Sequence, residues 1–173
     1  IIRDSKGRKM SKSLSNSPDP LDLFKKYGAD AVRVSILMIA PQGLDILFSE
    51  ERLEQGRNFM NKIWNSSRFI LMNLEDGLPL ALGEIDVKNL DTTDLWILSR
   101  LNRTITTVNK AYDKYKMNEA IRWVYDFIWA DFCDWYIEFA KTRFYGDDME
   151  DRAIAQSVSV YVMREVLKLL HPY

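Results

Sequence analysis

The chain of 173 residues is 47% hydrophobic and 28% charged, and its 24 Lys and Arg residues against 25 Asp and Glu residues give a formal net charge of −1. These values exclude a disordered or collagen-like chain, and they exclude a protein that holds nucleic acids through its overall charge, so any RNA site must be a local basic patch. One cysteine, Cys133, and one histidine, His171, allow neither an internal disulfide nor a four-ligand zinc site, which fits a reducing, cytoplasmic setting.

The N-terminal segment reads as a basic loop. Five of the first twelve residues are basic, namely Arg3, Lys6, Arg8, Lys9 and Lys12. The string KMSKS, Lys9 to Ser13, sets two ammonium groups three residues apart, and Gly7 and the serines make the loop mobile. Lysines on such a loop can close over a polyphosphate and stabilise the charge that develops as pyrophosphate departs. The alternative is a solvated basic loop without a ligand.

Two short helices are predicted to follow this loop. Residues 16–20 have the composition of a turn, and residues 20–28 are predicted to form a helix that Gly28 ends in the left-handed conformation. A second, apolar helix over residues 29–40 stops at Pro41, and residues 42–48 are predicted to form a turn and a short extended piece. We place a domain boundary between residues 48 and 49.

The remainder of the chain has the apolar periodicity of long amphipathic helices. These are predicted over residues 50–74, 92–116, 118–145 and 149–170, with a loop around Gly77, Pro79 and Gly83. Because most connections are short, neighbouring helices are expected to be antiparallel. The predicted fold class is mainly α, with an antiparallel four-helix bundle over residues 49–173 and a small, mostly helical segment over residues 1–48. No apolar run approaches the ~20 residues that span a bilayer, so no membrane partner is expected.

The first long helix carries a stripe of residues suited to RNA. Arg57, Asn61, Trp64 and Arg68 recur at spacings of four, three and four, which places a guanidinium, an amide, an indole and a second guanidinium on one face. Arginine suits phosphates, and an aromatic ring suits unstacked bases of single-stranded loops. The alternative is that Arg57 and Asn61 bond neighbouring helices and that Trp64 belongs to the core.

The predicted long helix over residues 118–145 is rich in aromatic residues and also carries polar groups, each of which has two interpretations. Cys133 is expected to be a buried apolar group rather than a nucleophile, because no histidine lies near it in the sequence. Asp134 and Glu138 lie one turn apart like an acid pair, but without a metal-ligand set we expect them to bond partners on the helix face. Lys141 and Arg143 complement the helix dipole, and phosphate contact is a second interpretation.

KMSKS is the signature loop of the class I aminoacyl-tRNA synthetases, and the stretch KMSKSLSNSPDPLDLFKKYGADAVR resembles the part of those enzymes that leads into the stem-contact region. The strings NFMNKIWNSSRFILMN and FIWADFCDWYIEFAK resemble helices of the valyl-tRNA synthetases more than those of the isoleucyl and leucyl enzymes. The resemblance covers essentially the whole chain. It implies that residues 1–48 end the catalytic region and that residues 49–173 form the helical anticodon-binding domain.

The resemblance also assigns roles to single residues. The implied ATP contacts are Lys9, Met10, Ser11, Lys12 and Ser13. Lys9 and Lys12 take the catalytic role, with Lys12 matching the second lysine of the family motif. Ser15 stands where the family pattern Leu-Gly-Asn has glycine. If that position has a positive φ, the serine is strained.

The full-length enzyme implied by the resemblance uses ATP and magnesium to join valine to its tRNA, without a DNA partner. The chain lacks the HIGH-type motif and the editing domain of the class, begins without methionine and ends just after a helix-breaking proline. We therefore expect a segment of a longer protein that holds no cofactor by itself and is inactive alone. Two alternatives stay open: an isoleucyl or leucyl enzyme, and a non-catalytic helical RNA-binding or protein-interaction module that keeps KMSKS as a relic.

Overall fold

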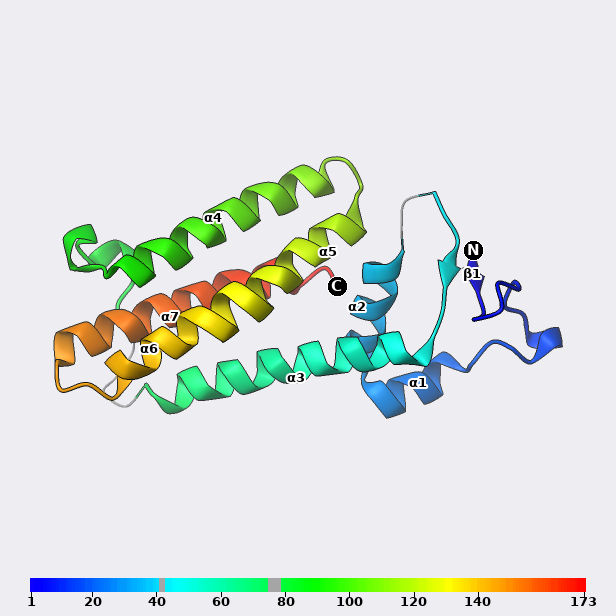
Figure 1. Ribbon diagram of the computed structural model, residues 1–173, viewed down its shortest axis with the longest axis horizontal. Coiled ribbons are helices and arrows are strands. Elements are labelled where there is room, and N and C mark those ends of the chain that lie inside the picture. The colour runs from blue at the N-terminus through cyan, green and yellow to red at the C-terminus, as the bar shows by residue number, and fades with distance from the viewer. Residues whose placement is uncertain (41–42, 75–78) are drawn as a thin grey trace. The chain divides into compact units, whose positions relative to one another are not determined.

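The computed structural model describes residues 1–40, 43–74 and 79–173, and its contacts divide the chain into two compact units (Figure 1). The first unit comprises residues 1–61, 108–122 and 173, and the second comprises residues 62–107 and 123–172. Helices α3 (Glu50–Met72), α4 (Thr92–Tyr112) and α5 (Met117–Asp126) contribute to both units. The predicted boundary between residues 48 and 49 stays a prediction, and the predicted features at Pro41, Gln42 and Gly77 lie outside the described residues.

The first unit begins with a small parallel sheet that sequence patterns did not predict in full. Strand β1 (Ile2–Arg3) pairs with β2 (Ile46–Leu47), with Ile2 opposite Ile46. The Arg3 side chain donates to the carboxylate of Asp45, just before β2. Strand β2 lies in the predicted extended piece, whereas β1 lies in a segment predicted to be only a loop. The sheet therefore ties the start of the basic loop to the chain before α3.

Helices α1 (Pro20–Tyr27) and α2 (Ala29–Ile39) confirm the two predicted short helices. The Asp19 side chain accepts a hydrogen bond from the backbone N–H of Leu21, which caps α1 at its N-terminus. Gly28 ends α1 with φ 90° and ψ 147°. The positive φ is as predicted, but this ψ lies outside the left-handed helical region, so the chain turns sharply into α2 rather than closing a helical cap.

A close approach of two helices organises the core of the first unit. A Cβ atom added to Gly56 of α3 would lie 2.1 Å from Oγ of Ser35 and 2.5 Å from the carbonyl oxygen of Ala31, both on α2. Only glycine permits that approach. The buried cluster around this contact is Leu23, Tyr27, Ala31, Val32 and Leu53. This packing fixes α1 and α2 against the first half of α3 (Figure 1).

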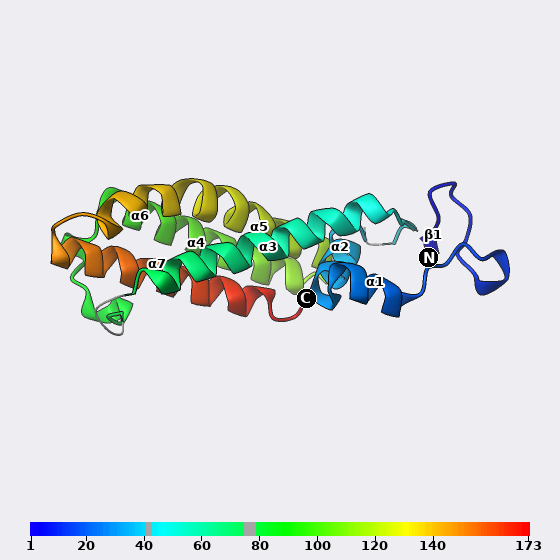
Figure 2. The ribbon, with the colours of Figure 1, turned by 90° about the horizontal axis from the view of Figure 1, so that it is seen from below.

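The second unit is a helical bundle in which successive helices alternate in direction. It contains the second half of α3, the first part of α4, a continuous helical stretch from α5 through the π-helical η4 (Phe127–Tyr136) to α6 (Ile137–Phe144), and α7 (Met149–Leu170). A turn at residues 145–148 joins α6 to α7 (Figure 2). The predicted mainly α bundle is confirmed, although α4 ends at Tyr112 rather than near Lys116.

The π-helical stretch differs from the uninterrupted α-helix that periodicity predicts over residues 118–145. In a π-helix hydrogen bonds join residues five apart, so side chains five apart come onto one face. The rings of Phe127 and Phe132 are accordingly stacked, with centroids 6.5 Å apart. Aromatic residues at mixed spacings satisfy both helix types, so the sequence pattern did not distinguish them.

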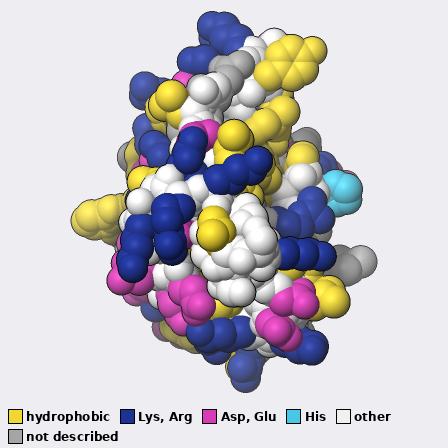
Figure 3. Space-filling view, turned by 90° about the vertical axis from the view of Figure 1, so that its right-hand side faces the viewer, with side chains coloured by type: hydrophobic (Ala, Val, Ile, Leu, Met, Phe, Trp, Pro, Cys, Tyr) yellow, Lys and Arg dark blue, Asp and Glu magenta, His cyan; other side chains and the backbone are white. Residues whose placement is uncertain are grey.

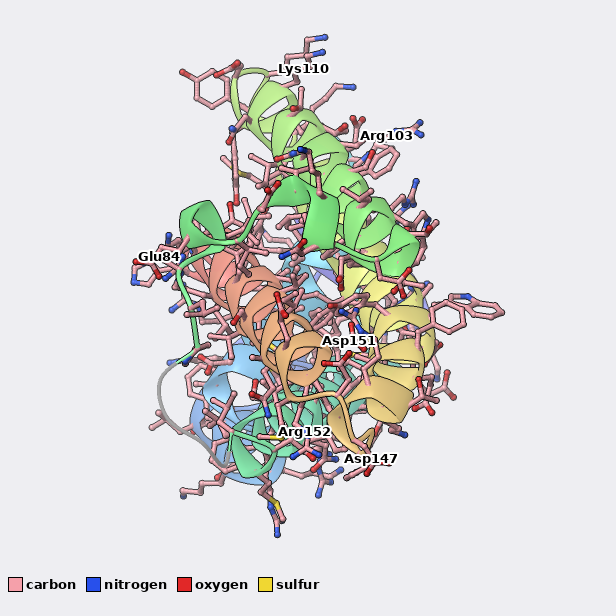
Figure 4. All side chains as sticks on the ribbon, turned by 90° about the vertical axis from the view of Figure 1, so that its left-hand side faces the viewer. Glu84, Arg103, Lys110, Asp147, Asp151 and Arg152 are labelled. Atoms are coloured by element: carbon pink, nitrogen blue, oxygen red, sulfur yellow. The ribbon has the colours of Figure 1, made fainter. Side chains whose placement is uncertain are left out.

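A buried ion pair joins three helices of the second unit. Nη1 of Arg143 on α6 lies 2.8 Å from both carboxylate oxygens of Asp94 on α4, and the hydroxyl of Tyr136 donates to Oδ1 of Asp94 at 2.7 Å. Arg143 also reaches Asp151 at 2.7 Å. Asp151 lies in the first turn of α7 and is labelled in Figure 4. Burial, then the Asp94 charge, raises the pKa of Tyr136 well above its usual value, so it stays a donor. The interpretation of Arg143 as a phosphate contact is wrong, because the side chain is buried.

Candidate functional site

The KMSKS residues, Lys9 to Ser13, lie on a loop anchored to β1. Arg3 and Lys9 form an antiparallel bridge, and the backbone N–H of Met10 donates to the carbonyl oxygen of Ile2 at 3.2 Å. The single turn η1 (Lys12–Leu14) follows, and within the loop the hydroxyls of Ser11 and Ser13 lie 3.1 Å apart. The backbone of the signature is thus hydrogen-bonded to β1 and within the loop, and the mobility expected from its small residues stays a prediction.

The side chains of the two lysines of the signature are exposed to solvent. Lys9 and Lys12 are exposed, and neither ammonium has a hydrogen-bond or ion-pair partner among the described residues. Met10 is half-buried and helps to line a hollow of about 720 Å³, together with Asp4, Asn16 and residues 48–51. Lys and Arg side chains are prominent on the face shown in Figure 3, which views the protein from the side of its N-terminal segment. Two exposed ammonium groups without a partner in the described part of the chain can bind an anionic, phosphate-bearing ligand.

Asp4 and Asn16, which sequence patterns did not single out, organise this loop. Asp4 is buried, and its Oδ1 accepts the backbone N–H groups of Lys6 at 3.0 Å and Arg8 at 2.9 Å. Its Oδ2 accepts from Nδ2 of Asn16 at 3.0 Å and from Nε of Arg8 at 2.8 Å. The hydrogen bond from Asn16, helped by those from Arg8 and Lys6, holds the pKa of the Asp4 carboxyl well below its usual range. Asp4 is therefore ionised at neutral pH.

Ser15 has the backbone conformation that the missing glycine would favour. Its φ of 49° and ψ of 27° lie in the left-handed helical region, and its N–H donates to the carbonyl oxygen of Lys12 at 3.1 Å. The condition under which strain was predicted, a positive φ at residue 15, is therefore met. A non-glycine residue there costs roughly 1–2 kcal/mol, and a β-branched one costs more.

Replacing Ser15 by valine is accordingly expected to lower the local free energy of opening by about 1–2 kcal/mol, because a second branch at Cβ crowds the left-handed backbone. Hydrogen exchange at the amide of residue 15 measures this directly. The matched control is Ser17→Val, because Ser17 is exposed in the same segment and has no positive φ. Equal protection in the two variants would contradict the prediction.

All four residues of the predicted RNA stripe are exposed on α3. They are Arg57, Asn61, Trp64 and Arg68. Trp64 is 71% exposed, so the alternative that places it in the core is wrong. Trp64 and Arg68 line one shallow hollow of about 300 Å³, together with Ser67, Leu71 and Met72. The exposed indole of Trp64 can stack on a base, and the guanidinium of Arg68 can contact a phosphate.

The other polar groups of the aromatic helix have structural partners. Asp134 pairs with Lys62 of α3, and Glu138 pairs with Lys141 at 2.6 Å, as expected for partner bonding on the helix face. Cys133 is buried, and burial raises the pKa of its thiol, which opposes a nucleophilic role. Within residues 1–40, 43–74 and 79–173, His, Cys, Asp and Glu form no group of three or more that could hold a metal ion. In that same part of the chain no helix has the length and apolar character to cross a bilayer.

Two family models match separate parts of the chain. The model described as tRNA synthetases class I (I, L, M and V) matches residues 1–49, which contain the KMSKS loop. The model described as the anticodon-binding domain of tRNA ligase matches residues 94–173, which contain most of α4 and all of α5 to α7.

Curated relatives match along the whole chain. The valine–tRNA ligase of Latilactobacillus sakei is 49% identical over 172 residues, which cover 99% of this chain and 19% of that protein. The valine–tRNA ligase of Bacillus cereus is 48% identical over 174 residues, with 100% and 19% covered. The chain thus spans about a fifth of the length of these relatives.

Solved structures share the fold at lower identity. A leucyl-tRNA synthetase of Agrobacterium radiobacter K84 in complex with tRNA and LeuAMS superposes with a TM-score of 0.72 at 22% identity, covering 100% of this chain and 20% of that one. The methionyl-tRNA synthetase of Mycobacterium tuberculosis with methionyl-adenylate gives a TM-score of 0.76 at 22% identity, covering 99% and 34%. At these identities the likeness concerns the fold alone.

Proposed function

Because this chain belongs to the class I aminoacyl-tRNA synthetases and matches valine–tRNA ligases along its whole length, we propose that it is a working part of such a ligase. The full-length protein activates valine with ATP and transfers the valyl group to its tRNA. Residues 1–48 end the catalytic region, and residues 49–173 form the anticodon-binding domain, a division supported by the two family matches at residues 1–49 and 94–173. The protein acts in the cytoplasm, where tRNA is charged.

The observation that carries the ATP role is the two exposed lysines, which have no partner among the described residues, on a loop hydrogen-bonded to β1. In adenylate formation the valine carboxylate attacks the α-phosphorus of ATP, and the bond to the pyrophosphate oxygen breaks. Lys9 and Lys12 neutralise the charge that grows on the departing pyrophosphate, which favours the transition state over bound ATP. Ser11 and Ser13 offer hydroxyls to the phosphate oxygens. Met10, between the two lysines, keeps its side chain half-buried.

Magnesium would accompany ATP in this proposal and would neutralise part of the charge on its phosphates. Mg²⁺ keeps several waters and is held through one or two carboxylates plus substrate phosphates. The described part of this chain contains no cluster of acidic, histidine or cysteine side chains for a metal ion. In this proposal the chain supplies the ammonium groups of Lys9 and Lys12 to the pyrophosphate.

Valine-dependent exchange of pyrophosphate into ATP by the full-length protein tests the proposed function. We expect exchange with valine, and none from the 173-residue chain alone, because one loop cannot hold ATP and an amino acid. Preference for isoleucine or leucine would replace the valyl assignment with one of its relatives. No exchange with any amino acid would favour the non-catalytic RNA-binding or interaction module.

The proposal assigns the tRNA contact to the stripe on α3. Replacing Arg57 and Arg68 together by alanine is expected to weaken tRNA binding and to lower the slope of log affinity against log salt by about 1–2, since two phosphate contacts are lost. Filter binding across a salt series measures both quantities. Trp64→Ala is expected to cost about 1–3 kcal/mol of binding if a base stacks on it.

Arg103→Ala is the matched control for the stripe, because Arg103 is an exposed arginine on another helix, α4 (Figure 4). An equal effect of this control would assign the loss to net charge rather than to the stripe. Unchanged affinity of the Arg57→Ala/Arg68→Ala protein, with its helical content intact, would remove α3 from the tRNA-binding surface.

A further inference from the structure

The segment before the KMSKS signature and the segment after it are held together by one pair of side chains. Nδ2 of Asn16 donates to Oδ2 of Asp4 at 3.0 Å, across twelve residues of chain that contain the whole signature. Asp4 is 8% exposed, whereas the lysines between these two residues are exposed. A buried, ionised carboxylate with four donors is a rigid point in an otherwise open loop.

The same asparagine also binds the backbone of the signature on both sides of Met10. Oδ1 of Asn16 accepts the N–H of Ser11 at 2.9 Å, and Nδ2 donates to the carbonyl oxygen of Lys9 at 3.3 Å. One carboxamide therefore acts as donor and acceptor at the same time. Aspartate at this position has no donor, and leucine, of similar size, has neither donor nor acceptor.

We infer that Asp4 and Asn16 form a clasp, here defined as these two residues and their hydrogen bonds to each other, to Lys9 and to Ser11, which positions Lys9 and Lys12 for the pyrophosphate of ATP. The inference rests on the proposed function for its ligand. The clasp fixes the backbone of the signature and leaves both ammonium groups exposed, so the loop backbone does not have to be ordered before the charges meet the leaving group. Asp4 and Asn16 are positioning residues, because neither needs to touch ATP.

The clasp also accounts for the strained backbone that follows the signature. Ser15 enters the left-handed region one residue before Asn16, and the turn η1 precedes it. A tight turn there brings the Asn16 side chain back over Lys9 and Ser11. The strain at Ser15 is consistent with a loop whose geometry is set by long-range bonds rather than by local preference.

The test uses Asn16→Leu and Asp4→Asn in the full-length protein, with valine-dependent pyrophosphate exchange as the assay. Each variant is expected to lower the exchange rate by about 10- to 100-fold, the loss typical of a displaced reacting group, while the KM for valine stays unchanged. In a protein that already carries Lys9→Ala and Lys12→Ala, Asn16→Leu is expected to change the rate by less than about threefold, because both lysines that it would displace are already absent. Losses that multiply in full would overturn the inference, since a merely structural residue acts independently of Lys9 and Lys12.

A second measurement does not depend on activity. Trypsin cleaves after lysine, and release of the clasp is expected to speed cleavage after Lys9 and Lys12 about tenfold in the folded full-length protein, because local opening exposes the loop. The matched control is Asp22→Asn, which removes a carboxylate from the exposed face of α1. An unchanged cleavage rate in Asn16→Leu would show that no clasp holds the loop. Absence of exchange in the wild-type protein would instead refute the proposed function, and proteolysis would then decide the clasp alone.

Discussion

Replacing Asp94 by alanine is expected to destabilise the folded chain by about 3–5 kcal/mol, which is among the largest effects of a single substitution. Asp94 is fully buried, and its carboxylate accepts from Arg143, from the hydroxyl of Tyr136 and from the backbone N–H of Asp91. Without it, Asp151 is the only charged partner left to the Arg143 guanidinium in the described part of the chain. Urea denaturation followed by helical circular dichroism measures the loss.

Three further variants separate the ion pair from its surroundings. Tyr136→Phe removes one donor and is expected to cost about 1.5–3 kcal/mol, since the bond goes to a charged acceptor. The Asp94→Leu/Arg143→Met double variant is expected to be more stable than Asp94→Ala, because no buried charge is left unpaired. Asp147→Ala, an exposed acid in the α6–α7 turn (Figure 4), serves as control and is expected to stay within about 0.5 kcal/mol. A double variant less stable than the single one would contradict this account.

The long helices could be predicted from the sequence because their apolar periodicity persists for many turns. Helix α7 (Met149–Leu170) has the predicted bounds, and α3 differs by two residues at its end. The π-helical η4 could not be predicted, because buried aromatic residues surround that stretch and fit more than one helical period. Strand β1 was also missed, since two residues paired across 44 positions leave no local pattern.

The candidate site was predicted where it depends on a contiguous motif and missed where it depends on long-range bonds. The lysines of KMSKS follow each other in the chain, so their chemistry is visible in the sequence. Asp4 and Asn16 are residue types common in loops and lie twelve positions apart in the sequence. Their pairing is visible only in the structure, where Nδ2 of Asn16 lies 3.0 Å from Oδ2 of Asp4. Asp94 likewise lies in the first turn of α4 with nothing in the local sequence to distinguish it, because its main partner is 49 residues away.

Replacing Lys12 by alanine is expected to lower the rate of valine-dependent adenylate formation by about 10²–10³-fold in the full-length protein, which corresponds to roughly 2.7–4 kcal/mol of transition-state stabilisation. The physical reason is that Lys12 interacts more strongly with the transition state than with bound ATP. The Lys12 ammonium has no partner within residues 1–40, 43–74 and 79–173, and its attraction to pyrophosphate grows as the bond to the α-phosphorus breaks. The loss is therefore expected in kcat more than in the KM for ATP. Rapid-quench measurement of adenylate formation determines both values.

Lys6→Ala is the matched control, because Lys6 is an exposed lysine of the same loop three residues before the signature, and its rate is expected to stay within about twofold. A general electrostatic role would make the two variants alike, because both remove one positive charge from the same end of the first unit. A role confined to ground-state binding would raise the KM for ATP and leave kcat unchanged. A large fall in kcat with Lys12→Ala alone is the only result that assigns the departing pyrophosphate to this lysine.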